Sequence, residues 1–191
     1  MSIPTSNDNP EVSAANMTLN AVGIIKNEVK EPFLKAGEKG IKMEGELDDV
    51  AERVDKIKHA LSEIVIHPEY AGLLQGVDEF SHLIVLYWAH KVPSGSRSLT
   101  RIHPMGREEI PEQGIFATCS PARPNPVLVT VVKVRGRKDN VLTVAGLDAV
   151  DQSPVIDLKP YVPKQFPQEG VVISDWMQRI LDEMADTAPP A

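Results

Sequence analysis

Residues 127–147 read VLVTVVKVRGRKDNVLTVAGL, and this stretch does most to decide the fold class. Two runs rich in Val, Leu and Thr flank the polar loop RGRKDN. β-Branched residues favour extended backbone, while Gly136 and the pair Asp139–Asn140 suit a tight connection. The stretch therefore predicts a β-hairpin.

Similar short runs recur along the chain, separated by Gly, Pro, Asp and Asn. The 16 prolines, many of them between these runs, suit a barrel with stiff loops better than a helical bundle. We predict a mainly β fold. Its expected strands are Leu19–Ile25, Gly40–Leu47, Ile64–His67, Ser81–Trp88, Ile115–Thr118, Val127–Val134, Val141–Ala145 and Pro154–Asp157.

A few short helices and a C-terminal helix complete the prediction. Apolar residues recur at helical spacing in Asp48–Leu61, a helical turn or two fits Pro68–Leu74, and Ser174 is a suitable N-cap for Asp175–Ala185. A C-terminal helix this short is marginal alone, so it must dock on its own barrel or on a partner subunit. The face expected to dock carries Trp176, Ile180, Leu181 and Met184.

The chain length of 191 residues suits one domain with extensions. We expect a flexible tail over residues 1–17, a barrel domain over 18–165 and a helical extension over 166–191. The single cysteine excludes an internal disulfide and fits a reducing compartment. The longest apolar run, Leu83–Ala89, is far shorter than the roughly 20 residues that span a bilayer, and the N-terminus lacks a secretory pattern. A cytoplasmic protein without a membrane partner is expected.

Charge is distributed unevenly in this acidic chain. The net charge is −7, yet nine basic and four acidic residues lie between Leu86 and Asp139. This basic middle is either a site for a polyanion or a solvated surface. Within it, residues 92–113 show no clear period, which favours a long loop that is either a binding lid or a disordered insertion.

Several common catalytic motifs are absent. The sequence contains no GxGxxG after a strand, no phosphate-binding GxxxxGK loop, no GxSxG and no HExxH. The histidines at 67, 82, 90 and 103 are too scattered to suggest a metal site, so no metal is expected. An enzyme with this sequence must build its cofactor site in another way.

Three longer segments provide a specific signal. They are FSHLIVLYWAHK (80–91), GIFATCSPARPNPVLVTVVKV (114–134) and GLDAVDQSPVIDLKPYVP (146–163). In order and separation they resemble the motifs of the TrmO/TsaA-like family, and the resemblance extends over residues 19–163. It implies a compact β-barrel that binds S-adenosylmethionine near a homodimer interface. It also implies methylation of the exocyclic nitrogen of threonylcarbamoyl-adenosine beside the anticodon of tRNA.

The resemblance, together with residue type, gives a candidate site. Asp148 and Asp151 are three residues apart and can approach one pocket as proton acceptor or cofactor contact, although Asp148 can instead cap the turn. Arg123, held by the flanking prolines, can pair with a carboxylate or phosphate, or with an internal aspartate. His90 is either a cofactor contact or a structural histidine. The implied cofactor-binding residues are His90, Lys91, Phe116, Cys119, Arg123, Asn125, Leu128, Asp151, Gln152 and Ser153, with Phe116 as the best candidate to stack on adenine.

Three positions depart from the family pattern. Cys119 replaces an arginine, Leu128 replaces a glycine, and Gln152 replaces a glycine. If that last glycine has a positive φ, Gln152 is strained or the turn differs. The loss of the arginine means that another base, Lys91 or Arg101, holds the polar end of the cofactor, or that the substrate differs.

Two basic groups are expected to flank the pocket and hold the anticodon stem. On a strand, Lys133, Arg135 and Arg137 would point to one side. The predicted RNA-binding residues are Arg97, Arg101 and Arg107 in the loop and Lys133, Arg135, Arg137 and Lys138 in the hairpin.

Two other functions stay open: methylation of a small-molecule acceptor, and a non-catalytic barrel that senses the cofactor or binds protein.

Overall fold

The structure is a computed structural model that describes residues 18–37, 40–43 and 47–187. The tail expected over residues 1–17 lies outside these ranges. The strands are β1 (Gly23–Lys26), β2 (Leu34–Gly37), β3 (Gly40–Met43), β4 (Leu61–Ile66), β5 (His82–Trp88), β6 (Arg101–Ile102), β7 (Gln113–Gly114), β8 (Val127–Lys138), β9 (Val141–Ala145) and β10 (Pro154–Pro160). The α-helices are α1 (Leu47–His59) and α2 (Asp175–Thr187), and short 3-10 helices are η1 (Pro68–Leu74), η2 (Val77–Glu79), η3 (Ser94–Ser98), η4 (Pro104–Gly106), η5 (Ile115–Ala117) and η6 (Pro163–Gln165).

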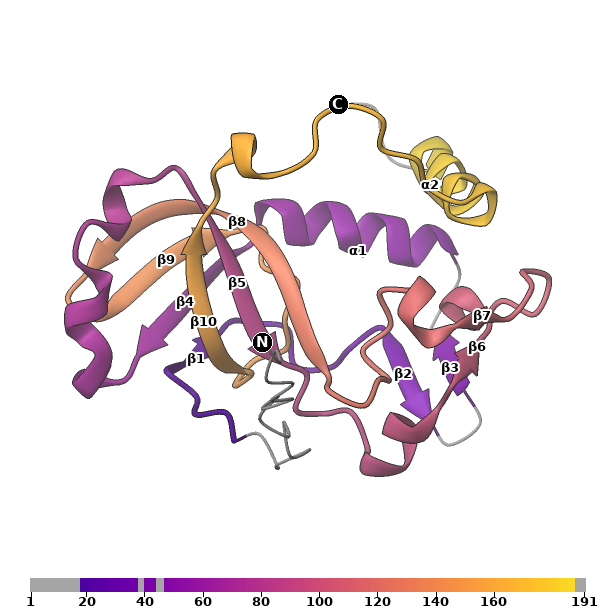
Figure 1. The fold of residues 1–191 in the computed structure, drawn as a ribbon, viewed down its shortest axis with the longest axis horizontal. Helices are drawn as coiled ribbons and strands as arrows, with labels where there is room; N and C mark the ends of the chain where they lie inside the picture. The colour runs from indigo at the N-terminus through magenta and orange to yellow at the C-terminus, as the bar shows by residue number, and fades with distance from the viewer. Residues whose placement is uncertain (1–17, 38–39, 44–46, 188–191) are drawn as a thin grey trace, which may run out of the picture.

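Six antiparallel strands close into a barrel in the order β1-β10-β5-β8-β9-β4, with β4 returning to β1 (Figure 1). Alternate residues of β5, among them Leu83, Val85 and Tyr87, point into the barrel and are almost fully buried. Closure between β1 and β4 depends on Gly23, because a Cβ at this position would collide with the carbonyl oxygen of Val65. The prediction of a mainly β barrel is confirmed.

Most predicted strands are present with shifted ends. Val141–Ala145 matches β9, and Ser81–Trp88 differs from β5 by one residue. Ile115–Thr118 was predicted as a strand, but this is wrong, because Ile115–Ala117 form η5. A single 3-10 turn buries Ile115 and leaves Phe116 exposed. The chain then continues toward the proline-rich stretch 121–126.

A smaller unit lies beside the barrel and contains the β2–β3 hairpin and the β6–β7 pair (Figure 1). It has its own core of Ile41, Ile102, Ile115 and Ala122. The prediction of an irregular loop over residues 92–113 is therefore wrong: short elements form because buried side chains such as Ile102 anchor them.

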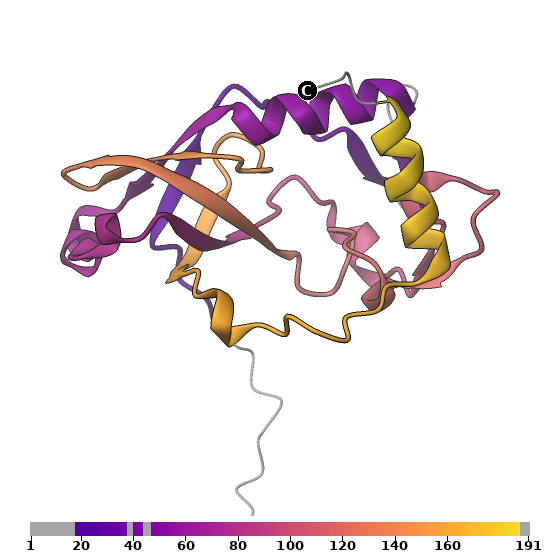
Figure 2. The same ribbon diagram turned by 90° about the horizontal axis from the view of Figure 1, so that it is seen from above.

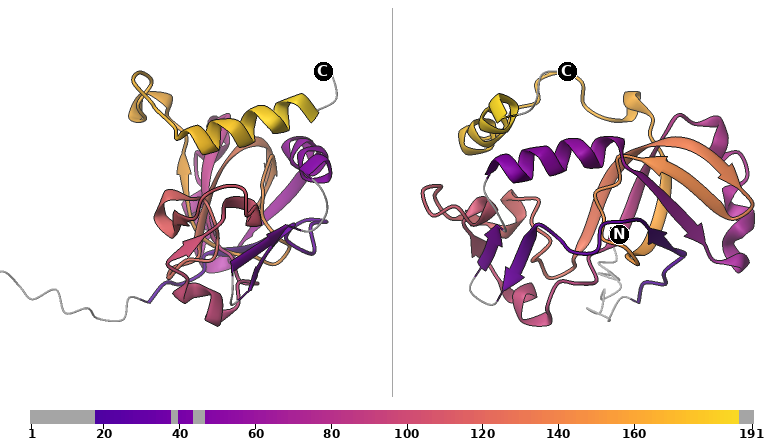
Figure 3. Two further views of the ribbon diagram at one scale, coloured as in Figure 1. Left: turned by 90° about the vertical axis from the view of Figure 1, so that its right-hand side faces the viewer. Right: turned by 180° about the vertical axis from the view of Figure 1, so that it is seen from behind.

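The C-terminal helix docks on its own chain. Helix α2 crosses the end of α1, at the side of the smaller unit (Figures 2 and 3). Ile180 is buried in this contact, whereas Leu181, predicted on the docking face, is 48% exposed. An ion pair between Arg107 and Glu183 links α2 to the segment after η4. Within the described ranges, no helix is long and apolar enough to cross a membrane.

The predicted β8–β9 hairpin is confirmed, with an irregularity that matters for its charges. Strand β8 continues to Lys138, and the register shifts between Val134 and Gly136. Lys133 pairs with Ala145, whereas Arg137 pairs with Leu142. Leu142 and Ala145 lie on opposite faces of β9, so the side chains of Lys133 and Arg137 also lie on opposite faces of the hairpin. The prediction that Lys133, Arg135 and Arg137 share one side is therefore wrong. Arg137 folds over the barrel and donates to the backbone carbonyl of Leu74 at 2.8 Å.

Candidate active site

A cavity of about 410 Å³ opens where the barrel meets the smaller unit. Its walls come from the three motif segments and from a fourth segment, residues 29–36, that precedes and enters β2. Most of this lining is apolar. The motif residues that line it are Tyr87, Ala89, His90, Lys91, Thr118, Cys119, Pro121, Arg123, Val127, Leu128, Val129, Thr130, Asp148, Ala149, Val150 and Ser153.

The cavity brings together most, but not all, of the predicted site residues. Seven of them line it: His90, Lys91, Cys119, Arg123, Leu128, Asp148 and Ser153. The other four, Phe116, Asn125, Asp151 and Gln152, are absent from the lining.

Asp148 is the single acid among the lining residues. The hydroxyl of Tyr87, which is buried inside the barrel, donates to the backbone carbonyl of Asp148 and lies 3.3 Å from Thr130 Oγ1. Asp148 lines the cavity and remains exposed to solvent, but the surrounding atoms partly desolvate its carboxyl group. This desolvation raises the pKa of the carboxyl, while the more distant Arg53 acts in the opposite direction.

His90 lies on the same cavity, just after the end of β5. Its Nδ1 is 3.2 Å from the Oγ of Ser153, a buried side chain of the third motif segment. Burial and, to a smaller extent, the neighbouring Lys91 lower the pKa of this imidazole. His90 is therefore neutral at physiological pH, with one ring nitrogen able to accept a proton.

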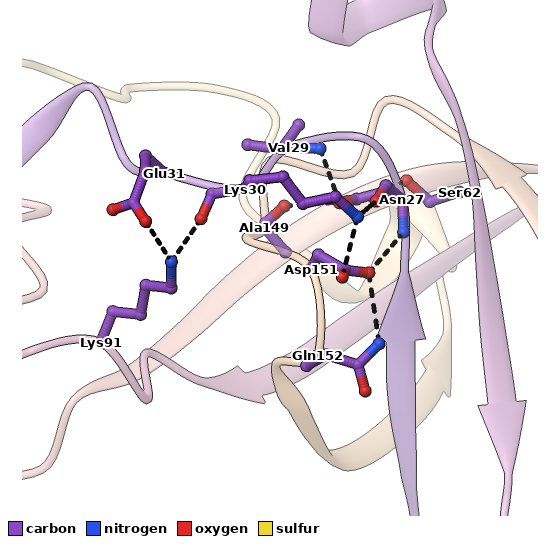
Figure 4. Close-up of polar contacts among 9 residues, drawn as sticks. All are labelled: Asn27, Val29, Lys30, Glu31, Ser62, Lys91, Ala149, Asp151 and Gln152. Atoms are coloured by element: carbon purple, nitrogen blue, oxygen red, sulfur yellow. Dashed lines mark hydrogen bonds and ion pairs between the residues drawn. The ribbon is translucent and has the colours of Figure 1, made fainter.

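Two cations line the cavity. Lys91 pairs with Glu31 at 2.6 Å and also donates to the backbone carbonyl of Lys30 (Figure 4). Arg123 donates from Nε to the carbonyl of Ser120 at 2.8 Å and from Nη2 to the carbonyl of Thr118 at 2.6 Å. Arg123 thus fixes the loop that carries Cys119 through carbonyl groups rather than through an aspartate.

Asp151 belongs to a polar network with Asn27, Lys30 and Gln152 (Figure 4), and none of these four residues lines the cavity. Its carboxylate accepts hydrogen bonds from the backbone of Asn27 at 3.0 Å and from Lys30 Nζ at 2.9 Å. These two donors, the amide first, lower the pKa of Asp151 to about 2. The side chain of Asn27 continues the network to Ser62 and to the backbone of Ala149.

The remaining predicted cofactor residues have other environments. Gln152 adopts φ = 65°, a left-handed conformation that suits the glycine of the family pattern. Phe116 is 82% exposed on η5, away from the cavity lining. Asn125 is exposed, and its carbonyl accepts from the amide of Val127 at 2.7 Å.

The predicted RNA-binding residues do not form one group around the cavity. In the loop, Arg107 pairs with Glu109 and Glu183, and Arg97 lies over the ring of Trp88 at 5.4 Å. The hairpin tip lies eight residues along β8 from Thr130, roughly 25 Å at the usual strand rise. The prediction that the hairpin flanks the cavity is therefore wrong, because β8 carries the tip to the far end of the barrel (Figure 1).

Sequence reasoning did not place Tyr87 or the wall segment 29–36 in the site. The polar run KNEVKEP after the first strand was a weak signal for that wall. Across the described residues, no group of three or more His, Cys, Asp or Glu side chains is arranged to hold a metal ion.

Comparison with known proteins gives consistent matches. Residues 48–165 match the tRNA-methyltransferase O N-terminal domain family. An S-adenosyl-L-methionine-binding protein of Archaeoglobus fulgidus is 38% identical over 148 residues, which cover 78% of this chain and 91% of that protein. The tRNA (adenine(37)-N6)-methyltransferase of Escherichia coli K12 is 32% identical over 149 residues, covering 74% of this chain and 56% of the E. coli protein.

The fold has also been seen in solved structures. A crystal structure of TrmO from P. aeruginosa superimposes with a TM-score of 0.60 and 22% sequence identity, covering 94% of this chain and 66% of the TrmO chain. At this identity the likeness shows the shared fold.

Proposed function

The chain belongs to the tRNA-methyltransferase O family, and on that premise we propose that it transfers the methyl group of S-adenosylmethionine to the exocyclic nitrogen of threonylcarbamoyl-adenosine beside the anticodon of tRNA. The observation that carries this proposal is the cavity itself. All three motif segments, which are far apart in the sequence, meet on it and supply an acid, a neutral imidazole and two cations.

The lining residues fit S-adenosylmethionine. A volume of about 410 Å³ lies within the usual range of small-molecule sites. Apolar walls that include Leu34 and Val129 suit the adenine ring and methylene groups. Asp148 suits the positive sulfonium, and Lys91 suits the carboxylate of the methionyl end, replacing the charge that Cys119 lacks.

When bound, the cofactor supplies an electrophilic methyl group on a sulfonium. The residues of this chain must then hold the acceptor and take up the proton that its nitrogen loses. His90 is neutral and faces the cavity, and the raised pKa of Asp148 makes it a better proton acceptor than an ordinary aspartate. The Tyr87 hydroxyl fixes the backbone at Asp148.

Mass spectrometry of tRNA nucleosides tests the acceptor. A strain that lacks the gene should lose methylated threonylcarbamoyl-adenosine, and the wild-type chain should restore it. Asp148→Asn should restore much less, whereas Asp157→Asn, a change on the outer side of β10 away from the cavity lining, should restore it fully. An unchanged level of the modified nucleoside in the deletion strain would refute the tRNA proposal.

A second candidate is methyl transfer to a smaller acceptor. It is favoured by the distance between the basic hairpin and the cavity and by the internal contacts of Arg97 and Arg107. If the acceptor is instead tRNA, its binding must depend on exposed cations such as Arg101 and the hairpin lysines. Neutralising Lys133, Arg135 and Lys138 together distinguishes the two functions. If the protein binds tRNA, the salt dependence of its tRNA affinity should flatten by about one unit of slope for each lost contact.

We further propose that the protein is a homodimer, as the family resemblance implies, and that it is cytoplasmic, which fits its single cysteine. Helix α2 already packs on α1 of its own chain and buries Ile180 there, so this face of α2 is not free for a dimer interface. Light scattering that gives the monomer mass of 20.9 kDa at working concentration would contradict the dimer.

A further inference from the structure

One wall of the cavity lacks the support of regular secondary structure. Between β1 and β2 the chain has neither helix nor strand, yet Val29, Pro32 and Phe33 from this stretch line the cavity. A wall made of irregular backbone keeps its shape only when other groups satisfy its hydrogen bonds. The contacts of this segment therefore decide how well the cavity is formed before any ligand arrives.

Asp151 supplies the main contacts from the barrel side. One carboxylate oxygen accepts from the amide of Asn27 at 3.0 Å, and the other accepts from Lys30 Nζ at 2.9 Å (Figure 4). The backbone amide of Asp151 donates to the carbonyl of Val29 at 2.7 Å. Three attachments, at Asn27, Val29 and Lys30, thus join this single residue to the start of the wall segment and to the stretch just before it.

Other residues complete the attachment. The side chain of Asn27 accepts from the amide of Val29 at 3.0 Å and donates to the carbonyl of Ala149 at 2.9 Å. On the cavity side, Lys91 pairs with Glu31. The wall segment is held from both faces, and Asp151 lies on the face that does not line the cavity.

We propose that Asp151 is a positioning residue: through Asn27 and Lys30 it holds the wall segment 29–36 in the shape that the cofactor needs, without touching the cofactor or the reacting atoms. This inference rests on the proposed function for the identity of the ligand. The low pKa of Asp151 agrees with it, since a carboxylate with a pKa of about 2 is a weak proton acceptor at neutral pH.

The experiment compares Asp151→Ala and Asp151→Asn with Lys30→Met. Asp157→Ala is the matched control, because Asp157 likewise accepts from a backbone amide, that of Leu158, and pairs with a lysine, Lys159, but does not line the cavity. Three quantities are measured: amide hydrogen exchange of residues 29–34 in the free protein, affinity for S-adenosylhomocysteine by calorimetry, and the single-turnover methylation rate at saturating S-adenosylmethionine.

Asp151→Ala removes the side-chain hydrogen bonds with Asn27 and Lys30. We expect it to speed exchange of residues 29–34 and to weaken ligand binding about tenfold. The rate at saturating cofactor should change little. Lys30→Met should act in the same direction, and adding it to Asp151→Ala should weaken binding no further. Asp151→Asn, which retains an acceptor for the Asn27 amide, should be milder, and Asp157→Ala should match the wild type.

Two outcomes would overturn the proposal. Weaker binding with unchanged exchange of residues 29–34 would mean that Asp151 contacts the ligand, and a collapsed saturating rate with unchanged affinity would make it the proton acceptor. Exchange is measured without ligand. A wild-type chain that binds neither S-adenosyl compound would therefore refute the proposed function, while slow exchange in Asp151→Ala would refute the anchoring itself.

Discussion

Replacing Gln152 by glycine should stabilise the protein. Gln152 has φ = 65°, where a side chain costs about 1–2 kcal/mol relative to the right-handed region. Glycine removes this cost but gains freedom in the unfolded chain, which offsets about 0.4–1 kcal/mol. The side-chain hydrogen bond that Gln152 donates to Asp151 is given up, but it is long at 3.4 Å and exposed. The expected net gain is about 0.5–1 kcal/mol in the free energy of unfolding.

Urea unfolding followed by circular dichroism measures this gain, and thermal unfolding should show a rise in Tm of about 2 °C. Two controls separate strain from other effects. Gln152→Ala keeps the Cβ and should give no gain, while Gln75→Gly replaces an exposed glutamine at φ = −60° and should destabilise by about 0.5–1 kcal/mol. Equal stability of the glycine and alanine variants at position 152 would refute the assignment of strain.

Three further predictions concern pairs that join distant segments. The pKa of Asp151 is lowered to about 2 from an ordinary 3.8, so the stabilisation that its carboxylate gives the folded protein is complete above pH 4 and is lost as the pH falls toward 2. The unfolding free energy of Asp151→Asn should therefore depend less on pH in this window than that of the wild type. Urea titrations measure this difference. Arg107→Met removes the ion pair with Glu183, and we expect a loss of about 1 kcal/mol and faster proteolysis of the linker before α2, measured by gel. Tyr87→Phe removes a buried hydroxyl and leaves the Asp148 carbonyl without that donor, so it should cost about 1–2 kcal/mol in urea and weaken cofactor binding in calorimetry.

Local sequence predicted much of the barrel. The β9 run VLTVA alternates less buried and buried side chains from Val141 to Val144, and this pattern can be read from the strand itself. Strand β8 was predicted for the same reason, although its register shift at Arg135 was not. A bulge depends on which residues the neighbouring strand offers, and this information lies outside the strand.

Part of the candidate site could also be predicted from local sequence motifs. His90, Lys91, Asp148 and Ser153 belong to motifs that could be read directly, and the structure brings them onto one cavity. Phe116 was assigned to the site by the family resemblance and its residue type, but the direction of its side chain depends on the turn at η5 and leaves it exposed.

The sequence by itself determined the fold class, the family resemblance, the hairpin and the unusual side chain at position 152, because each depends on local backbone preference or on residues adjacent in the chain. Only the tertiary structure decided which carboxylate faces the cavity and which one holds its wall. Asn27 and Asp151 are 124 residues apart, and the barrel brings them together by pairing β1 with β10. Contacts at such separation follow from strand order and register, which no single segment of the chain contains.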